Sequence, residues 1–234
     1  MANKRGKMKK QKAELNKHVH NRHSLSPKTS NQAGYIRAIV ENDVTICSGP
    51  AGSGKTTICV GLACEHLLAG KIEKIIITRP VVESGGGLGY LPGSFHDKIH
   101  PYLVPVMDEM SKYISSSGID YIKKNNILEV CPLEYMRGRN FHNSFIILDE
   151  AQNATIEQIK MFITRLGRKS KAVVNGDVNQ TDLPNRVRGG LSTCISCLRG
   201  LHGVGIVELG DDDVIRHGII SAILFRLEDA QGSA

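Results

Sequence analysis

Residues 49–56 are Gly49-Pro-Ala-Gly-Ser-Gly-Lys-Thr56, which matches the pattern G-x-x-x-x-G-K-[ST]. The stretch follows an apolar run at residues 44–48 and precedes a segment with helical character. Glycines let such a turn point successive backbone N–H groups at phosphate oxygens, and the start of the helix adds a partial positive charge. A chance glycine turn would lack this strand-and-helix context. The stretch therefore predicts a phosphate-binding loop (P-loop) in an α/β protein.

Outward from this loop, short apolar runs alternate with helix-length segments. Nearly continuous apolar runs are typical of a parallel sheet that is covered on both faces. A longer segment, Glu83–Leu133, is predicted to be an insertion with one or two helices, around Ser94–Lys112 and Ile119–Asn125. The predicted strands are Val44–Ser48, Lys74–Thr78, Ser144–Leu148, Lys171–Asn175 and Gly205–Leu209. The predicted helices are Gln32–Glu41, Lys55–Ala69, Ile156–Leu166, Leu191–Leu198 and Val214–Leu227.

The positive charge of the chain is concentrated at its start. The net charge is +7, yet residues 1–28 hold nine Lys or Arg and one acidic residue, so the remainder is close to neutral. Residues 1–30 show no apolar periodicity, and we expect a basic flexible tail without an apolar face, followed by one domain over residues 31–234. Two alternatives remain for this tail, an arm that binds RNA or DNA and a solvated leader with no partner.

Composition excludes several classes of protein. The apolar fraction of 41% is ordinary for a globular domain. No stretch approaches the roughly 18 apolar residues of a membrane span, and no apolar segment follows the first charges as in a secretory signal. The six cysteines lack the spacing of a disulfide framework. We therefore expect a reduced, cytoplasmic protein without a membrane partner.

A second chemical motif is the apolar strand Phe145-Ile-Ile-Leu148, which ends in Asp149 and Glu150. A P-loop site needs one acid near Mg²⁺ and one group that polarises the attacking water, and two successive residues at a neighbouring strand end can supply both. Parallel strands bring their carboxyl ends to the same sheet edge, beside the loop. The alternative is an ordinary acidic strand end or helix cap.

Two weaker signals accompany these motifs. Gln180 follows the turn Gly176-Asp177, where an amide can bond the γ-phosphate and the attacking water, although many such turns are only structural. Arg137 and Arg139 flank a glycine ahead of the acidic strand. They can contact a nucleic-acid backbone or a neighbouring subunit's phosphates, or they can form a solvated turn.

Taken together, the ordered motifs over residues 31–228 resemble the PhoH-like ATPase family, which is related to the nucleotide-binding half of superfamily 1 helicases. The resemblance implies a P-loop NTPase fold with a RecA-like parallel sheet and helices on both faces. The motifs are Gly49–Thr56, Thr78-Arg79-Pro80, Leu88–Gly93, Arg137-Gly-Arg139, Leu148–Asn153, Thr164–Gly167, Gly176-Asp177 with Gln180, Asp182–Pro184 and Val214–His217.

The resemblance also assigns roles to single residues. It implies Thr56 and Asp149 as Mg²⁺ ligands, Glu150 as the catalytic base and Gln180 as the γ-phosphate sensor. Lys55 and Arg216 correspond to the cations that stabilise the phosphates, the second in cis or from a neighbouring subunit. Gln32 corresponds to the residue that recognises adenine. The full set of expected nucleotide contacts is Gln32, Gly49, Pro50, Ala51, Gly52, Ser53, Gly54, Lys55, Thr56 and Thr57.

The expected function is Mg²⁺-dependent ATP hydrolysis coupled to nucleic acid, with single-stranded RNA as the preferred partner. The family resemblance further implies a homo-oligomeric ring, such as a hexamer. A rival hypothesis is an ATP-dependent assembly or regulatory module that moves no strand, and a small-molecule kinase is a third. The chain shows no second RecA-like domain and no fused nuclease, which argues against processive two-domain unwinding.

Overall fold

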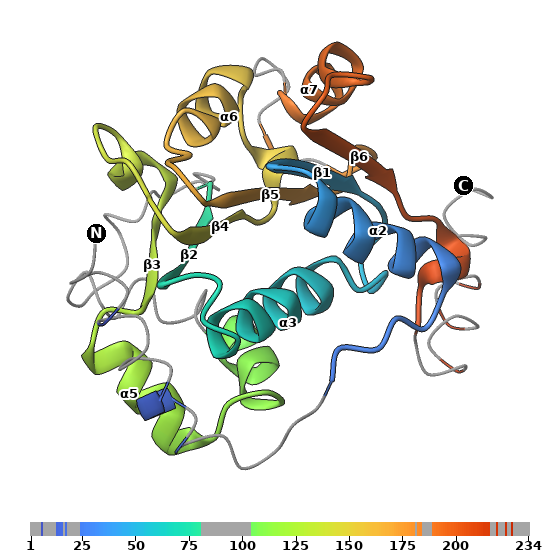
Figure 1. The fold of residues 1–234 in the computed structure, drawn as a ribbon. Helices are drawn as coiled ribbons and strands as arrows, with labels where there is room; N and C mark the ends of the chain where they lie inside the picture. The colour runs from blue at the N-terminus through green and yellow to red at the C-terminus, as the bar shows by residue number, and fades with distance from the viewer. Residues whose placement is uncertain are drawn as a thin grey trace, which may run out of the picture.

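The structure is a computed structural model that describes residues 6, 13–15, 17, 24–80, 104–180, 182–183, 189–215, 219, 223 and 226. Its described strands form one parallel sheet in the order β3-β2-β4-β5-β1-β6 (Figure 1). The strands are β1 Val44–Ser48, β2 Lys74–Arg79, β3 Leu128–Pro132, β4 Ser144–Leu148, β5 Lys171–Gly176 and β6 Val204–Glu208. The chain leaves β1, crosses over β5 and β4, and enters β2 next to β4.

Helices cover both faces of this sheet (Figure 1). On one face lie α2 Ser30–Glu41, α3 Lys55–Leu68, a helical segment at 104–111 and α5 Ser116–Lys124. On the other lie α6 Ile156–Ile163 and α7 Leu191–Leu198, with the short 3₁₀ helix η2 Leu133–Met136. Further 3₁₀ turns are η3 Ala151–Asn153 and η4 Asp211–Asp213. The layered α/β architecture with a parallel sheet confirms the expected fold class.

The two cores follow from the alternation of side chains along each strand. In β2, Ile75 and Ile77 pack into the core under α3, whereas Ile76 packs into the core under α6. All three are almost fully buried. Successive strand residues point to opposite faces, so a strand that is covered on both sides must be apolar at every position. This explains why the sequence of the central strands shows unbroken apolar runs.

The strand order places three chain turns side by side at one edge. β4, β5 and β1 are neighbours, in the register Ile146 opposite Ala172 and Ile46 opposite Val174. Their carboxyl ends are followed by Asp149, Asp177 and Gly49 respectively. Ligands in open parallel sheets bind at such an edge, so this edge is where the functional site belongs.

Most predicted elements are confirmed within a residue or two, but the segment 83–133 was misjudged. It contains β3, a strand that pairs with β2 at the edge of the sheet. The sequence hides it because Glu129 and Pro132 interrupt the apolar run, and an edge strand tolerates both residues. The expected helix 119–125 is α5. Of the expected helices 94–112 and 214–227, residues 94–103 and most of 216–227 lie outside the described residues.

The amino-terminal segment touches the domain where the structure describes it. The backbone N–H of Leu25 donates to Glu65 Oε1 over 2.8 Å, and Thr29 caps α2 while donating to Asp213. Leu15 is buried in the core under α3. The expectation that this segment has no apolar contact was therefore wrong at Leu15, and Leu25 packs against the same core. Isolated leucines in a basic stretch give no periodic signal. The domain boundary at residue 30 stays a prediction.

Candidate nucleotide site

The loop between β1 and α3 has the backbone geometry of an anion cradle. Gly52 and Gly54 adopt positive φ angles of 84° and 90°, which residues with a Cβ rarely adopt. A Cβ at Gly49 would lie 2.8 Å from Leu209 Cβ, so this position has no room for a side chain. Gly54 is the N-cap of α3 and offers no side-chain hydrogen bond to the helix. The first N–H groups of α3 thus keep the donor capacity that phosphate oxygens require.

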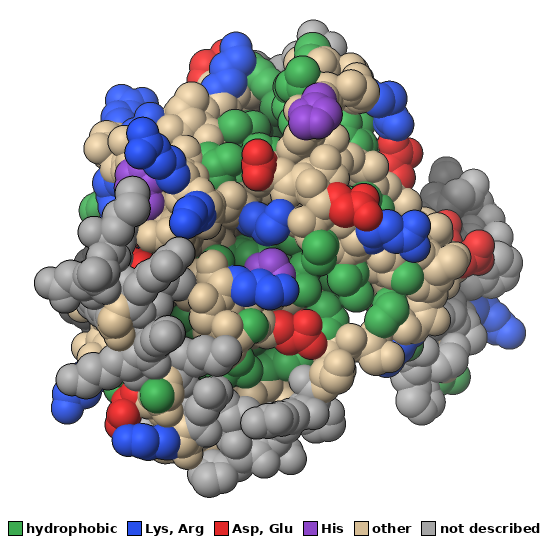
Figure 2. Space-filling model, viewed as in Figure 1, with side chains coloured by type: hydrophobic (Ala, Val, Ile, Leu, Met, Phe, Trp, Pro, Cys, Tyr) green, Lys and Arg blue, Asp and Glu red, His purple; other side chains and the backbone are tan. Residues whose placement is uncertain are grey.

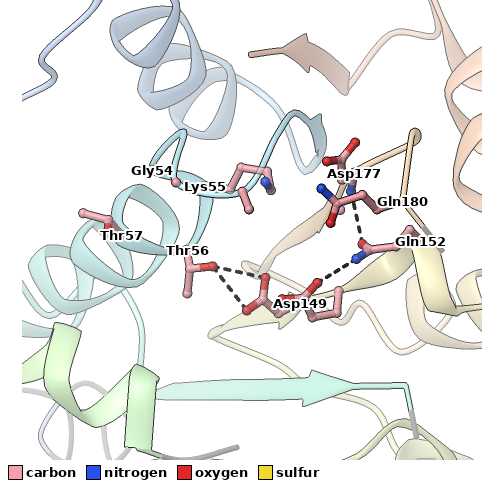
Figure 3. A pocket seen from close by; sticks show the side chains of 12 residues that line it. Gly54, Lys55, Thr56, Thr57, Asp149, Gln152, Asp177 and Gln180 are labelled. Carbon is pink, nitrogen blue, oxygen red and sulfur yellow. Dashed lines mark hydrogen bonds between the residues drawn. The ribbon is translucent and has the colours of Figure 1, made fainter. Parts of the chain in front are cut away.

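Lys55 supplies the cation of this cradle. Its Nζ donates to Gly49 O over 2.6 Å and to Pro50 O over 2.9 Å, so the loop carbonyls hold the ammonium at the mouth of the loop. The side chain lines a pocket of about 220 Å³ at the carboxyl edge of the sheet (Figure 3). An ammonium at this place can neutralise phosphate oxygens.

Asp149 and Thr56 meet on the floor of the same pocket (Figure 3). Thr56 Oγ1 donates to the carboxylate, at 3.3 Å from Oδ1 and 3.2 Å from Oδ2. Asp149 is only 2% exposed, and Arg79 Nη2 donates to its Oδ2 over 2.7 Å. A hydroxyl beside a carboxylate is the donor set that P-loop proteins use for Mg²⁺.

Glu150 lies beside Asp149 in an unusual backbone conformation. Its φ of 56° and ψ of 40° fall in the left-handed region, which costs a residue with a Cβ roughly 1–2 kcal/mol. Gln152 holds the Glu150 side chain, since its Nε2 donates to Glu150 Oε2 over 2.7 Å. The Gln152 Oε1 accepts from the backbone N–H of Asp177 over 3.1 Å. One amide therefore joins the carboxylate to the turn after β5 (Figure 3).

The turn after β5 is fastened to the phosphate loop. Gly49 N–H donates to Gly176 O over 3.1 Å, and Val178 N–H donates to Ser48 Oγ over 3.3 Å. Gln180 is exposed and lines the pocket across from Lys55 (Figure 3). The turn thus places an amide side chain on the wall of the pocket.

Apart from Gln32, the predicted site residues divide into three groups. Gly49, Pro50 and Ser53 belong to the loop but do not line the pocket. Arg216 lies outside the described residues; its neighbour Ile215 donates its N–H to Gly52 O over 3.4 Å. The structure brings the others together as pocket-lining residues: Ala51, Gly52, Gly54, Lys55, Thr56, Thr57, Asp149, Glu150 and Gln180.

Gln32 lies next to the loop and does not line the pocket. It is 4% exposed. Its Nε2 donates to Ser53 O over 3.0 Å, and its Oε1 accepts from Lys28 N–H over 2.8 Å. These bonds support the loop from the α2 side, and recognition of adenine by Gln32 stays a prediction.

Thr56 and Asp149 together fit the protein side of a magnesium–nucleotide complex. Within the part of the chain that the structure describes, no group of three or more His, Cys, Asp or Glu side chains is arranged to hold a metal. Mg²⁺ typically takes one or two protein ligands and completes its octahedron with waters and substrate phosphates. Thr56 and Asp149 would hold it here, next to the loop that would bind those phosphates.

Buried groups behind the loop join α2, α3 and β5. Tyr35 Oη donates to Asn175 Oδ1 over 2.5 Å, and Asn175 Nδ2 donates to Cys59 Sγ over 3.2 Å. Burial raises the pKa of the Cys59 and Cys47 thiols well above the ordinary value, so both stay neutral. All six cysteines are free, as the sequence predicts.

The two arginines with an open role are now distinguished. Arg139 forms an ion pair with Glu129, with Nη2 to Oε2 at 2.8 Å, and its guanidinium lies over the Phe141 ring at 4.7 Å. Arg137 is exposed and directly precedes Gly138, which adopts a φ of 77°. Arg139 therefore has partners within the domain, although its side chain is still 38% exposed, and for both arginines a phosphate contact stays a prediction.

Gly176 and Asp177 line the pocket but were not assigned a role from the sequence, although their motif was noted. Two further residues of the site were not assigned either, Gln152 and Arg79. Both lie in motifs of the family resemblance, Leu148–Asn153 and Thr78-Arg79-Pro80. Their roles depend on contacts across strands, so motif position was the one available signal.

Comparison with known proteins identifies the family. The model of the family described as "PhoH-like protein" matches residues 24–228. The chain belongs to the PhoH-like family. It is 43% identical over 201 residues to the PhoH-like protein of Bacillus subtilis, covering 86% of this chain and 63% of that protein. It is 40% identical over 195 residues to protein PhoH of Escherichia coli, covering 82% and 55%.

These PhoH-like relatives are longer than this chain, which spans about three fifths of the length of the Bacillus protein. Among solved structures, the UvsW helicase from bacteriophage T4 aligns with a TM-score of 0.49 and 16% identity, over 87% of this chain and 67% of that chain. The family match and the sheet topology together establish a P-loop NTPase fold. None of the helices in the described residues is long and apolar enough to cross a membrane.

Proposed function

We propose that this PhoH-like chain binds Mg²⁺·ATP, hydrolyses it, and couples hydrolysis to single-stranded RNA. One observation carries the proposal: the sheet edge brings Lys55, Thr56, Asp149, Glu150 and Gln180 into a single pocket. A mere phosphate-binding loop does not need an acidic pair and an amide on the opposite wall. Water activation does.

Each residue has a separate task in this proposal. Lys55 and the loop N–H groups bind the phosphates, and Thr56 with Asp149 holds Mg²⁺, which neutralises phosphate charge when bound. Glu150 accepts the proton of the attacking water at its free carboxylate oxygen. Gln152 fixes the other oxygen. Gln180 orients the water, and Arg216, next to the loop-bound Ile215, supplies a cation for the charge that develops on the transferred phosphoryl group.

Coupling to RNA rests on the family and on charge. The basic amino-terminal stretch and the exposed Arg137 supply cations that a phosphate backbone can contact. Assembly into a homo-oligomeric ring, with Arg216 acting on a neighbouring subunit's phosphates, belongs to the same proposal.

ATP hydrolysis by the full chain, measured with and without single-stranded poly-uridine RNA, tests the proposal. We expect Mg²⁺-dependent hydrolysis that RNA accelerates, with Lys55→Ala as the inactive control. Hydrolysis that RNA leaves unchanged would refute the coupling and retain the ATPase. Nucleotide binding without hydrolysis would favour a regulatory or assembly module instead.

A further inference from the structure

Asp149, the proposed Mg²⁺ ligand, already forms an ion pair with a cationic side chain of the protein, Arg79. Arg79 ends β2, and β2 pairs with β4 in a register that places Thr78 opposite Leu148. Asp149 follows Leu148, and its N–H donates to Thr78 O over 2.9 Å. The Arg79 guanidinium therefore reaches Asp149 from the neighbouring strand, at 2.7 Å between Nη2 and Oδ2.

This ion pair differs from the surface pairs of the molecule. The side chains of Arg79 and Asp149 are 20% and 3% exposed, whereas those of Arg199 and Glu208 are 61% and 62% exposed. The Arg79 Nε–H is buried and, among the described residues, has no hydrogen-bond partner. An arginine whose Nε–H donor is buried without a hydrogen bond is poorly satisfied as a purely structural group. The ion pair of Arg79 is with the Asp149 carboxylate.

The charges around the pocket show what this arginine changes. Three carboxylates line the pocket, those of Asp149, Glu150 and Asp177, against the single ammonium of Lys55. Arg79 is not among the lining residues, and its contact with Asp149 adds a second cation at the pocket floor. With a divalent cation bound, the Asp149 carboxylate would contact both the Arg79 guanidinium and the metal ion.

We propose that Arg79 sets the affinity of the site for its divalent cation. This inference rests on the proposed function. Arg79 holds the Asp149 carboxylate in place beside Thr56 before the cation arrives, and its own charge opposes the cation once it has arrived. Arg79 is thus a positioning residue that weakens metal binding, so that the metal–nucleotide product can leave after hydrolysis.

The expected effect is large enough to measure. Charges of +1 and +2 about 6 Å apart change an equilibrium constant about tenfold at the dielectric constant of water, which is the smallest effect expected for a largely buried pair. Replacing Arg79 by glutamine removes the charge and keeps a hydrogen-bond donor for Asp149. Replacing it by lysine keeps the charge and loses the planar fork.

The experiment is a titration of Mn²⁺ into the full chain with saturating ADP, followed by the electron paramagnetic resonance signal of free Mn²⁺. We expect Arg79→Gln to bind Mn²⁺ at least about tenfold more tightly than wild type, and Arg79→Lys to stay within about threefold of wild type. Asp149→Asn is the control that should bind more weakly. Unchanged or weaker binding by folded Arg79→Gln would overturn the proposal. A wild-type protein that binds neither ADP nor Mn²⁺ would instead refute the proposed function.

A second measurement is made on wild-type protein, and a variant serves only to assign the signal. The Nε–H signal of Arg79 in ¹⁵N-arginine-labelled protein should shift when Mg²⁺ is added to the ADP complex, because the cation competes for Asp149. The loss of that signal in Arg79→Lys assigns it. A signal that is unmoved by Mg²⁺ at saturation would show that Arg79 does not sense the cation.

Discussion

Lys55 is the single cation among the described residues that line the pocket. Lys55→Ala should weaken ATP binding by about 10²-fold, because a charged hydrogen bond contributes roughly 1.5–3 kcal/mol and the phosphates would face dipoles alone. Titration of a fluorescent ATP analogue in the presence of Mg²⁺ measures this. Lys123→Ala, on the exposed side of α5, serves as the control. Equal affinities for wild type and Lys55→Ala would remove the phosphate cradle from the proposed function.

Glu150 is the residue that should separate binding from turnover. Glu150→Gln keeps the size of the side chain and should leave ATP affinity unchanged, while kcat falls by roughly 10²- to 10⁴-fold, the usual contribution of a general base. Single-turnover hydrolysis and the analogue titration, carried out on the same preparation, distinguish the two effects. If Glu150→Gln hydrolyses ATP at the wild-type rate, the acidic strand end is structural.

At the residue scale, the sequence alone identified the side chains that are expected to react, but it did not identify the side chains that position them. The chemistry of Lys55, Asp149 and Glu150 follows from residue type and position after a strand. The contact from Gln152 to Asp177 N–H exists because Glu150 turns into the left-handed region and because β4 and β5 are neighbours. Neither the backbone conformation of Glu150 nor the pairing of β4 with β5 can be predicted from the local sequence.

At the scale of elements, α3 carries a buried histidine that makes stability depend on pH. Burial, with smaller contributions from Lys71 and Lys171, lowers the pKa of His66 from its ordinary value of 6.5 to about 4. His66 therefore becomes protonated near pH 6.5 in the unfolded chain but only near pH 4 in the folded chain. The free energy of unfolding should therefore fall as the pH drops through this window.

Urea denaturation of wild type and His66→Gln at pH 7, 6, 5 and 4 measures this dependence. The variant should be less stable at pH 7, since it loses the edge contact with Phe145 at 5.9 Å between ring centroids. Its loss of stability toward pH 4 should be shallower than that of wild type. Parallel curves for the two proteins would show that His66 does not contribute to the pH dependence.

The strands show which elements a sequence can reveal. β1, β4 and β5 are buried at every position or nearly so, and their continuous apolar runs predicted them. β3 lies at the edge with two half-buried positions, and its Glu129 pairs with Arg139. An edge strand needs no continuous apolar run, so periodicity did not reveal it.

At the scale of the whole molecule, the first residues carry most of the excess positive charge. Replacing Lys4, Lys7, Lys9 and Lys10 by glutamine should leave basal ATP hydrolysis intact and weaken RNA binding. Each lost phosphate contact should reduce the slope of log affinity against log salt by about 0.7 for a single strand. The slope should thus fall by up to roughly 3 units.

Fluorescence anisotropy with labelled poly-uridine at several salt concentrations measures the slope. Substitution is preferable to deletion, because the segment also contains Leu15, which packs in the core. Four substitutions on Lys112, Lys123, Lys124 and Lys160 give a control of equal charge. An unchanged slope in the tail variant would leave the tail as a solvated leader and direct attention to Arg137.

The order of the strands also determines which parts of the sheet can unfold locally while the nucleotide pocket stays intact. β3 and β6 end the sheet, and each pairs with one described neighbour, β2 and β1 respectively. The strands that carry the loop, the acidic pair and the Gln180 turn all have partners on both sides. Amide hydrogens of β3 and β6 should exchange with solvent through local opening, while those of β4 and β5 exchange only when most of the domain unfolds. The pocket should therefore lie on the slowest-exchanging part of the sheet, and local opening at either edge should leave it assembled.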